Sequence, residues 1–136
     1  MLPGILLASL GIAGATPTPP QGASARAVLP THDSAWRCGP EGWPGGSEFA
    51  VVSGDPMRAG SFMIRVELPI GYRLPSYRRP RDESIVVLVG SIEVDARTLG
   101  SGSFIRLRAN EWHSLGTKYG AIVQIYGDGP FEMNLL

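Results

Sequence analysis

The amino-acid sequence predicts an all-β fold, of the sandwich, jelly-roll or small-barrel kind, and three observations lead to this prediction. Eighteen glycines and twelve prolines in 136 residues interrupt almost every stretch that could form a long helix. Val, Ile and Phe are gathered in short runs, as is typical of strands. Between residues 62 and 68, apolar and polar side chains alternate with a period of two, which predicts a strand with one buried face. The length and the 43% hydrophobic content fit one domain with a substantial core.

The first 25 residues are set apart from this fold, because the first charged side chain is Arg26. Residues 2–15 form an uncharged apolar run of the length of a signal peptide, too short to span a bilayer. Residues 13–15 and 23–25 both fit a small-x-small cleavage site. We therefore expect export to the periplasm or the medium, with 26–136 as the mature domain. Because a basic n-region is missing, a cytoplasmic protein with a disordered extension is the alternative.

The expected elements follow in order along the chain. Residues 26–46 are rich in Pro, Gly and Trp, and we expect an arm with little regular structure whose aromatic side chains dock on a sheet. Short apolar or alternating runs then predict eight strands, at 49–53, 62–68, 84–89, 92–96, 103–107, 112–115, 121–126 and 131–135. Glycines predict turns at 89–91, 100–102 and 127–129, and Ala109 and Asn110 predict another.

Charge and cysteine content exclude two classes of function. Twelve basic and twelve acidic residues give a net charge of zero, so there is no basic field for a nucleic-acid backbone. Cys38 is the only cysteine and cannot form an intramolecular disulfide. With no second thiol or histidine cluster beside it, Cys38 is not a zinc site, and we expect it to be inert.

The two histidines differ in their expected roles. His32 lies in the Pro-rich arm and is expected at the surface. His113 follows Trp112 directly after the predicted turn at Ala109 and Asn110, where a side chain can point into the mouth of a barrel. A purely structural role for His113 is equally open.

Two spaced motifs resemble those of the small single-domain bacterial cupins. The first cupin motif, G-x5-H-x-H-x3-E-x6-G, falls without a gap on Gly71, Tyr77, Arg79, Glu83 and Gly90. The second motif, G-x5-P-x-G-x2-H, falls on Gly102, Arg108, Asn110 and His113. The resemblance covers about residues 26–136 and implies a cupin jelly-roll barrel. Since cupins commonly pair through an edge sheet, it also implies a possible homodimer.

The departures from these motifs predict that the metal site is largely lost. The resemblance implies that three His and one Glu would hold a divalent metal, yet Tyr77 and Arg79 stand at two of the His positions. Only Glu83 and His113 remain as metal ligands, should a metal bind. A guanidinium close to a divalent ion repels it, so we expect no stoichiometric metal.

The residues at these positions suggest a pocket for an anion instead. Strand alternation sends Tyr77 and Arg79 to one face and Arg78 to the other, and we expect Arg78 and Arg81 in solvent. Arg79 next to Glu83 is consistent with a buried ion pair that only neutralises a cavity. A guanidinium, a phenol and an imidazole also suit a small carboxylate-type ligand, bound by Tyr77, Arg79, Glu83 and His113.

Two kinds of enzyme are the alternatives to ligand binding. One is a metal-dependent cupin of the dioxygenase or isomerase type, acting through Glu83 and His113. The other is a metal-free lyase or isomerase, with His113 as base, Tyr77 as acid and Arg79 fixing the substrate anion. A filled barrel without a ligand is the third reading, and the sequence alone does not select among them.

Overall fold

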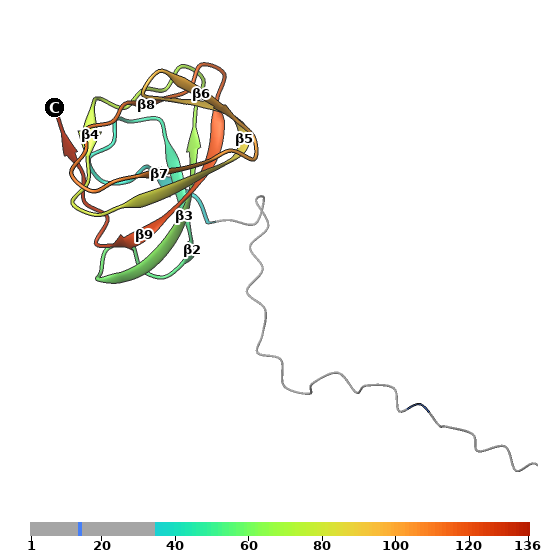
Figure 1. Ribbon diagram of the computed structural model, residues 1–136, viewed down its shortest axis with the longest axis vertical. Coiled ribbons are helices and arrows are strands. Elements are labelled where there is room, and N and C mark those ends of the chain that lie inside the picture. The colour runs from blue at the N-terminus through green and yellow to red at the C-terminus, as the bar shows by residue number, and fades with distance from the viewer. Residues whose placement is uncertain (1–13, 15–34) are drawn as a thin grey trace, which may run out of the picture.

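Ten strands make up the part of the chain that can be described. The structure, a computed structural model, describes residue 14 and residues 35–136. The strands are β1 (Arg37–Cys38), β2 (Glu48–Ser53), β3 (Gly60–Leu68), β4 (Tyr77–Arg78), β5 (Glu83–Val94), β6 (Arg97–Gly100), β7 (Phe104–Leu107), β8 (Leu115–Gly116), β9 (Ala121–Gly129) and β10 (Asn134–Leu135). They curl around a common interior (Figure 1), which confirms the all-β prediction. The expected signal peptide, with cleavage sites predicted at 13–15 and 23–25, lies outside the described residues apart from Gly14, and so does His32.

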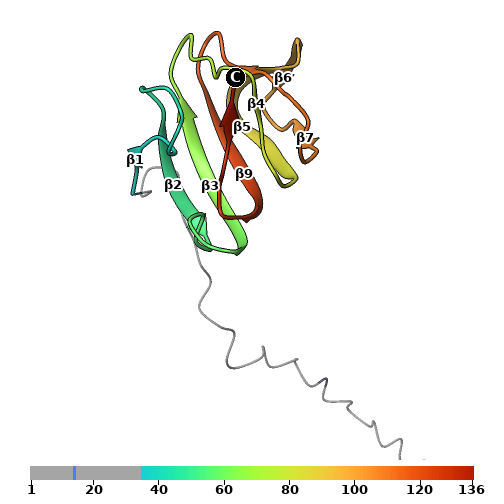
Figure 2. The same ribbon diagram turned by 90° about the vertical axis from the view of Figure 1, so that its left-hand side faces the viewer.

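The strands form two antiparallel layers that share β5. One layer has the order β1-β2-β3-β9-β5, with β7 on the other edge of β5, and Figure 2 shows β2, β3 and β9 side by side. In the other layer, β6 and β8 pair with the last residues of β5. Single bridges from Arg73 to Gly116 and from Tyr77 to His113 join the β4 and β8 segments, and β10 pairs with β4. In residues 14 and 35–136 no helix is long and apolar enough to cross a membrane.

Gly90 lets β5 pass from one layer to the other, and the turn predicted at 89–91 is wrong. Its φ of +76° is in the left-handed region, and a Cβ there would collide with the carbonyl oxygen of Gly120. Up to Gly90 the strand pairs with β9, and from Ser91 it pairs with β6. The strands expected at 84–89 and 92–96 are therefore one bent strand that ends at Val94.

Other element boundaries also differ from the prediction, because long-range pairing decides them. Asp95 and Ala96, with φ of 47° and 65°, form a two-residue turn into β6, a strand that the sequence did not predict. The turn expected at 127–129 is wrong, since these residues pair with Gly60 to Phe62 of β3. The strand expected at 112–115 shrinks to β8, and the one at 131–135 to β10. Two short strands, β1 and β4, were not expected either.

The core lies between the layers and follows the alternation seen in the sequence. The inward side chains of β3, at positions 62, 64, 66 and 68, are at most 3% exposed. They pack with inward side chains of β5 and β9, among them Ile85 and Ile125. As predicted for the arm, Trp43 packs against this core, with its ring 6.4 Å from that of Tyr72. Each such buried apolar side chain contributes about 1.5–3 kcal/mol, which makes this the main source of stability.

Candidate functional site

Three of the polar side chains that the sequence predicted as site residues lie inside the barrel. Tyr77 on β4, Arg79 just after it and Glu83 at the start of β5 are 2%, 3% and 3% exposed. The intervening Arg78 is exposed, and its guanidinium lies 5.0 Å from the centre of the Trp112 ring. The predicted alternation of Tyr77 and Arg79 against Arg78 is therefore confirmed.

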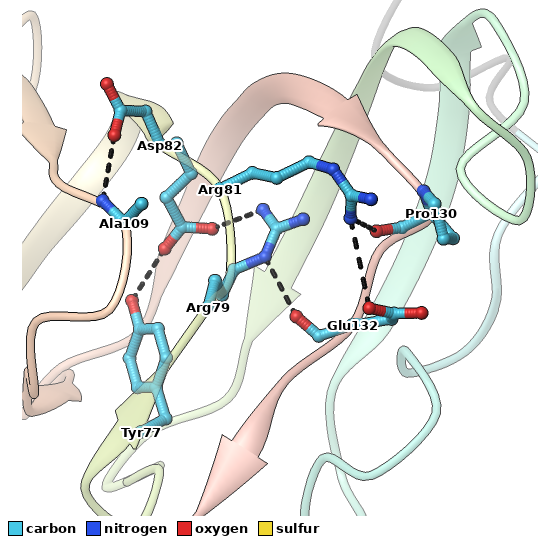
Figure 3. A network of polar contacts seen from close by, with 8 residues as sticks. Tyr77, Arg79, Arg81, Asp82, Ala109, Pro130 and Glu132 are labelled. Carbon is cyan, nitrogen blue, oxygen red and sulfur yellow. Dashed lines mark hydrogen bonds and ion pairs between the residues drawn. The ribbon is translucent and has the colours of Figure 1, made fainter.

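Glu83 joins the side chains of Tyr77 and Arg79, which are labelled in Figure 3, through its two oxygens. The Tyr77 hydroxyl donates to Oε1 and Arg79 Nη1 donates to Oε2, each at 2.8 Å. Since both hydrogen bonds are buried, their electrostatic strength is higher than it would be in water. The expected ion pair between Arg79 and Glu83 is present, with side chains 2% and 3% exposed.

The rest of the Arg79 guanidinium faces the C-terminal segment and the core. Its Nε donates to the carbonyl oxygen of Glu132 at 3.1 Å. The guanidinium carbon lies 4.2 Å from the centre of the Phe131 ring and 5.6 Å from that of Phe62, which are cation–π distances. Its Nη2 is buried and has no hydrogen-bond partner among the described residues. The N–H groups of Arg79 Nη2 therefore have no acceptor in the described part of the chain.

The side chain of His113 lies next to this network, and only the His113 backbone is hydrogen-bonded to it, through Tyr77. Its backbone exchanges two hydrogen bonds with Tyr77, and the two rings are 6.3 Å apart. Its Nδ1 is 2.8 Å from Asp95 Oδ2, while Nε2 is buried without a hydrogen-bond partner among the described residues, and Glu111 Oε2 lies 4.0 Å away. The predicted turn before His113 is present, with Asn110 at a φ of 64°.

Asp95 is the site residue that sequence reasoning missed. It occupies the first position of the turn between β5 and β6, where a positive φ is unfavourable for a residue other than glycine. Its Oδ1 accepts the backbone N–H of Ser114, and its Oδ2 contacts the imidazole of His113. The sequence placed Asp95 inside the strand expected at 92–96, so it indicated neither the turn nor the distant side chain that Asp95 meets.

Burial and charge set the protonation of this region. Burial raises the pKa of Tyr77 well above its ordinary value, and the negative charge of Glu83 raises it further, while Arg79 opposes both. The phenol therefore stays protonated and donates to Glu83. Burial also acts to raise the pKa of Asp95, but hydrogen bonds from His113 and Ser114 outweigh it, so this carboxyl is held ionised with a lowered pKa.

The donor set does not fit a divalent metal. Each oxygen of Glu83 already accepts a hydrogen bond, and one of them comes from a permanent cation. The residues at the two expected His positions supply a phenol with a raised pKa and a guanidinium, and neither is a ready metal ligand. No group of three or more His, Cys, Asp or Glu that could hold a metal is found in residues 14 and 35–136.

A C-terminal strap, residues 130–136, covers the network. Its last strand, β10, pairs with β4 over two residues, and the N–H of Leu136 donates to Ser76 at 2.9 Å. Arg81 holds the beginning of the strap, with Nη1 3.4 Å from the Pro130 carbonyl and 3.8 Å from the Glu132 carboxylate. Arg81 was expected in solvent and is only half-exposed, because this strap passes beside it.

Comparison with known proteins identifies the fold. No protein-family model and no curated protein matches the sequence. Among solved structures, an acetylacetone dioxygenase from Acinetobacter johnsonii aligns at 15% identity with a TM-score of 0.66, over 89% of this chain and 85% of that one. The polyketide cyclase RemF from Streptomyces resistomycificus aligns at 15% identity and a TM-score of 0.66, over 80% and 82%. An RmlC-like cupin from Ralstonia eutropha JMP134 aligns at 18% identity and 0.61, over 75% and 68%.

The protein is thus an all-β barrel of the jelly-roll class with polar side chains buried inside it. More specifically, it has the cupin fold, as the motif spacing indicated. At 14–18% identity these neighbours show the fold alone.

Proposed function

We propose that the protein binds a small carboxylate, or a similar small oxyanion, at Arg79 inside the barrel. The observation that carries this proposal is the buried Nη2 of Arg79, which has no partner in the described part of the chain. Arginine stays charged at any relevant pH, so these donors cannot be relieved by losing a proton. A buried charged donor without an acceptor is costly, and native proteins rarely leave one unpaired. A carboxylate oxygen would satisfy it.

The arrangement of the guanidinium supports an anion of small size. Nε and one hydrogen of Nη1 are engaged by Glu132 and Glu83, which leaves the Nη2 side of the fork for a ligand. Phe62, whose ring centre lies 5.6 Å from the guanidinium carbon, is only 3% exposed, so a large ligand would have to displace it. Small, flat anions such as formate, acetate or pyruvate suit this position best.

Thermal shift measurements test the proposal. The melting temperature is recorded with sodium formate, acetate, pyruvate and malonate against sodium chloride at equal ionic strength. At ten times Kd, binding stabilises the folded state by about 1.4 kcal/mol. For a domain of this size such a gain raises the melting temperature by on the order of 5–10 °C.

Two variants make this test specific. Arg79→Met should abolish the carboxylate response, whereas Arg97→Met removes the same charge from an exposed position on β6 and should keep it. No response of the parent protein to any of the four anions, or an equal response of the Arg79→Met variant, would support a filled barrel instead.

A metal-free acid–base enzyme is a second candidate, and the contact between Asp95 and His113 favours it. A carboxylate on Nδ1 fixes the imidazole tautomer and leaves Nε2 with a free electron pair, which is the arrangement of a general base. In this scheme a substrate binds Arg79 through its carboxylate and presents the adjacent C–H bond to Nε2 of His113. Tyr77 is a poor acid in this scheme, because its raised pKa and its hydrogen bond to Glu83 keep the proton in place.

Deuterium exchange into the methyl group of pyruvate tests this second candidate by proton NMR in heavy water. Catalysed exchange should disappear in His113→Gln and fall in Asp95→Asn. Exchange at the rate of buffer alone would leave the binding function as the better account. Two solved structures with a similar fold are an acetylacetone dioxygenase and a polyketide cyclase, which adds only that this fold can accommodate catalysis.

A further inference from the structure

A second candidate site lies on the solvent side of the β3-β9-β5-β7 sheet, away from the buried network. A groove of about 450 Å³ is lined there by polar side chains from four strands and their ends, chiefly Ser61, Asp82, Ser84, Arg106, Tyr126 and Asp128. This volume falls in the range of about 300–1,000 Å³ that is typical of small-molecule sites. Solubility requires only scattered polar residues on the solvent side of a sheet. Six polar side chains gathered around one groove exceed that requirement.

The strand register places these side chains in two adjacent rows. Met63, Tyr126, Ser84 and Arg106 are successive partners across β3, β9, β5 and β7. Ser61 and Asp128 are partners in the next row. Since side chains at alternate positions share a face, both rows point away from the core. The groups are therefore set by paired backbone, which is more rigid than a loop.

The charged groups of the groove are held in place. Asp82 Oδ2 accepts two hydrogen bonds from Arg106, at 2.7 and 3.2 Å, and its Oδ1 accepts the N–H of Ala109 at 2.8 Å. Asp128 Oδ1 accepts the Ser61 hydroxyl at 3.1 Å. Hydrogen bonds from Arg106 and Ala109 lower the pKa of Asp82, so this carboxyl is ionised. Two carboxylates against one guanidinium give the groove a formal charge of −1, which disfavours phosphates and carboxylates.

Aromatic surface adjoins these polar groups. The rings of Tyr126 and Phe104 lie 6.4 Å apart, and Phe104 is 56% exposed on β7. Tyr126 lines the groove and Phe104 packs beside it, so an apolar ring face lies next to the carboxylates and hydroxyls of the groove. A ligand that matches it needs one apolar face and a rim of neutral donors and acceptors. Sugar rings have this character, because their C–H bonds and hydroxyls point in different directions.

We infer that this groove binds a neutral carbohydrate, with Asp82, Asp128 and Arg106 engaging the sugar hydroxyls and the Tyr126 and Phe104 pair covering its C–H face. The inference is independent of the function proposed for the barrel interior. The two sites also select opposite ligands, since a buried cation attracts anions and a groove of charge −1 repels them.

NMR titration of the full chain tests the inference. The probes are the methyl glycosides of glucose, galactose and mannose, together with N-acetylglucosamine, maltose and cellobiose. We expect at least one of them to bind, with amide shifts confined to the strands around the groove. Asp128→Asn keeps the shape and should weaken binding about tenfold or more, the factor for losing a hydrogen bond to a charged group. Tyr126→Ala should abolish it, while Tyr119→Ala, at an aromatic that is 71% exposed elsewhere, should not.

Several results would overturn the inference. These are no binding of any of the six sugars, shifts outside the groove, or an affinity that Asp128→Asn leaves unchanged. A dimer in sedimentation that Phe104→Ala dissociates, together with absence of sugar binding, would assign this face to a second copy of the chain. Arg79→Met separates the two sites, because it should remove the carboxylate response and leave sugar binding as it is.

Discussion

Removing the carboxylate of Glu83 should destabilise the protein strongly, and removing Arg79 at the same time should restore much of the loss. Glu83→Ala takes away the acceptor for Arg79 Nη1 and for the Tyr77 hydroxyl in one change. The guanidinium cannot move into solvent, because Glu132 and the Phe131 ring hold it in place. A buried cation without a counter-charge remains, together with an unpaired phenol.

The expected magnitudes follow from these losses. Breaking a buried ion pair by removing one partner costs about 3–5 kcal/mol. The Tyr77 hydroxyl without its acceptor adds on the order of 1–3 kcal/mol. Glu83→Ala should therefore lower the free energy of unfolding by about 4–8 kcal/mol, a large share of the 5–15 kcal/mol of a typical domain. In Glu83→Ala with Arg79→Met the uncompensated charge is gone, and the loss should shrink by about 2–3 kcal/mol.

Urea unfolding at 25 °C, followed by tryptophan fluorescence and circular dichroism, measures the free energy of unfolding of four proteins: the parent, Glu83→Ala, Arg79→Met and the double variant. These four values form a double-mutant cycle, which gives the coupling between the two residues. The exposed pair of Arg73 and Glu93, also 2.8 Å apart but with side chains 65% and 34% exposed, is the matched control. Its coupling should stay within about 0–1 kcal/mol. If Glu83→Ala does not fold, Glu83→Gln keeps the size of the side chain and an acceptor for Tyr77. A coupling of Arg79 with Glu83 no larger than that of the control pair would refute the reasoning.

Three further predictions concern the same site. The raised pKa of Tyr77 means that the unfolded chain releases this proton near pH 10 while the folded chain retains it, so stability should fall as pH rises above about 10, and Tyr77→Phe should flatten this loss in urea unfolding between pH 9 and 11. Elemental analysis after expression in medium with added iron, manganese, nickel and zinc should find less than one metal per chain, because both oxygens of Glu83 are engaged; one tightly held ion per chain would contradict this. Deleting residues 134–136 removes the pairing of β10 with β4 and should speed amide hydrogen exchange around Tyr77 without changing it in β3 and β9, whereas equal exchange would show that the strap does not protect the site.

Local patterns in the sequence predicted those features that depend on neighbouring residues. The alternation from Phe62 to Leu68 identified β3 and its buried face, since a period of two leaves only one way to place the apolar side chains. The same rule placed Tyr77 and Arg79 inside and Arg78 outside. The spacing of the two motifs predicted the barrel and indicated that Glu83 lies next to Arg79. It did so although Tyr77 and Arg79 stand where the motif has histidines.

Features set by distant partners could not be predicted in this way. Gly90 looks like a turn residue, yet it bends a continuous strand because β9 and β6 supply partners on its two sides. Residues 127–129 look like a turn and extend β9 because β3 is long enough to pair with them. The carbonyl oxygen of Glu132 binds Arg79 from 53 positions away, and a backbone oxygen carries no sequence signal. The contact of Asp95 with His113 likewise depends on how the β5–β6 turn packs.

The balance of charge inside the barrel favours an anion over a cation as the ligand. Tyr77 is neutral, and Arg79 and Glu83 carry opposite charges, so the network has no net charge to offer a divalent ion. A divalent ion 4 Å from the single positive charge of the guanidinium would be repelled by about 8 kcal/mol, twice the value of about 4 kcal/mol for two unit charges at an effective dielectric constant of 20. A monoanion 4 Å from the guanidinium would instead be attracted to it by about 4 kcal/mol on the same scale, at the Nη2 side that Glu83 does not occupy. The proposed anion site therefore depends on Arg79, which stands where the cupin motif has a histidine.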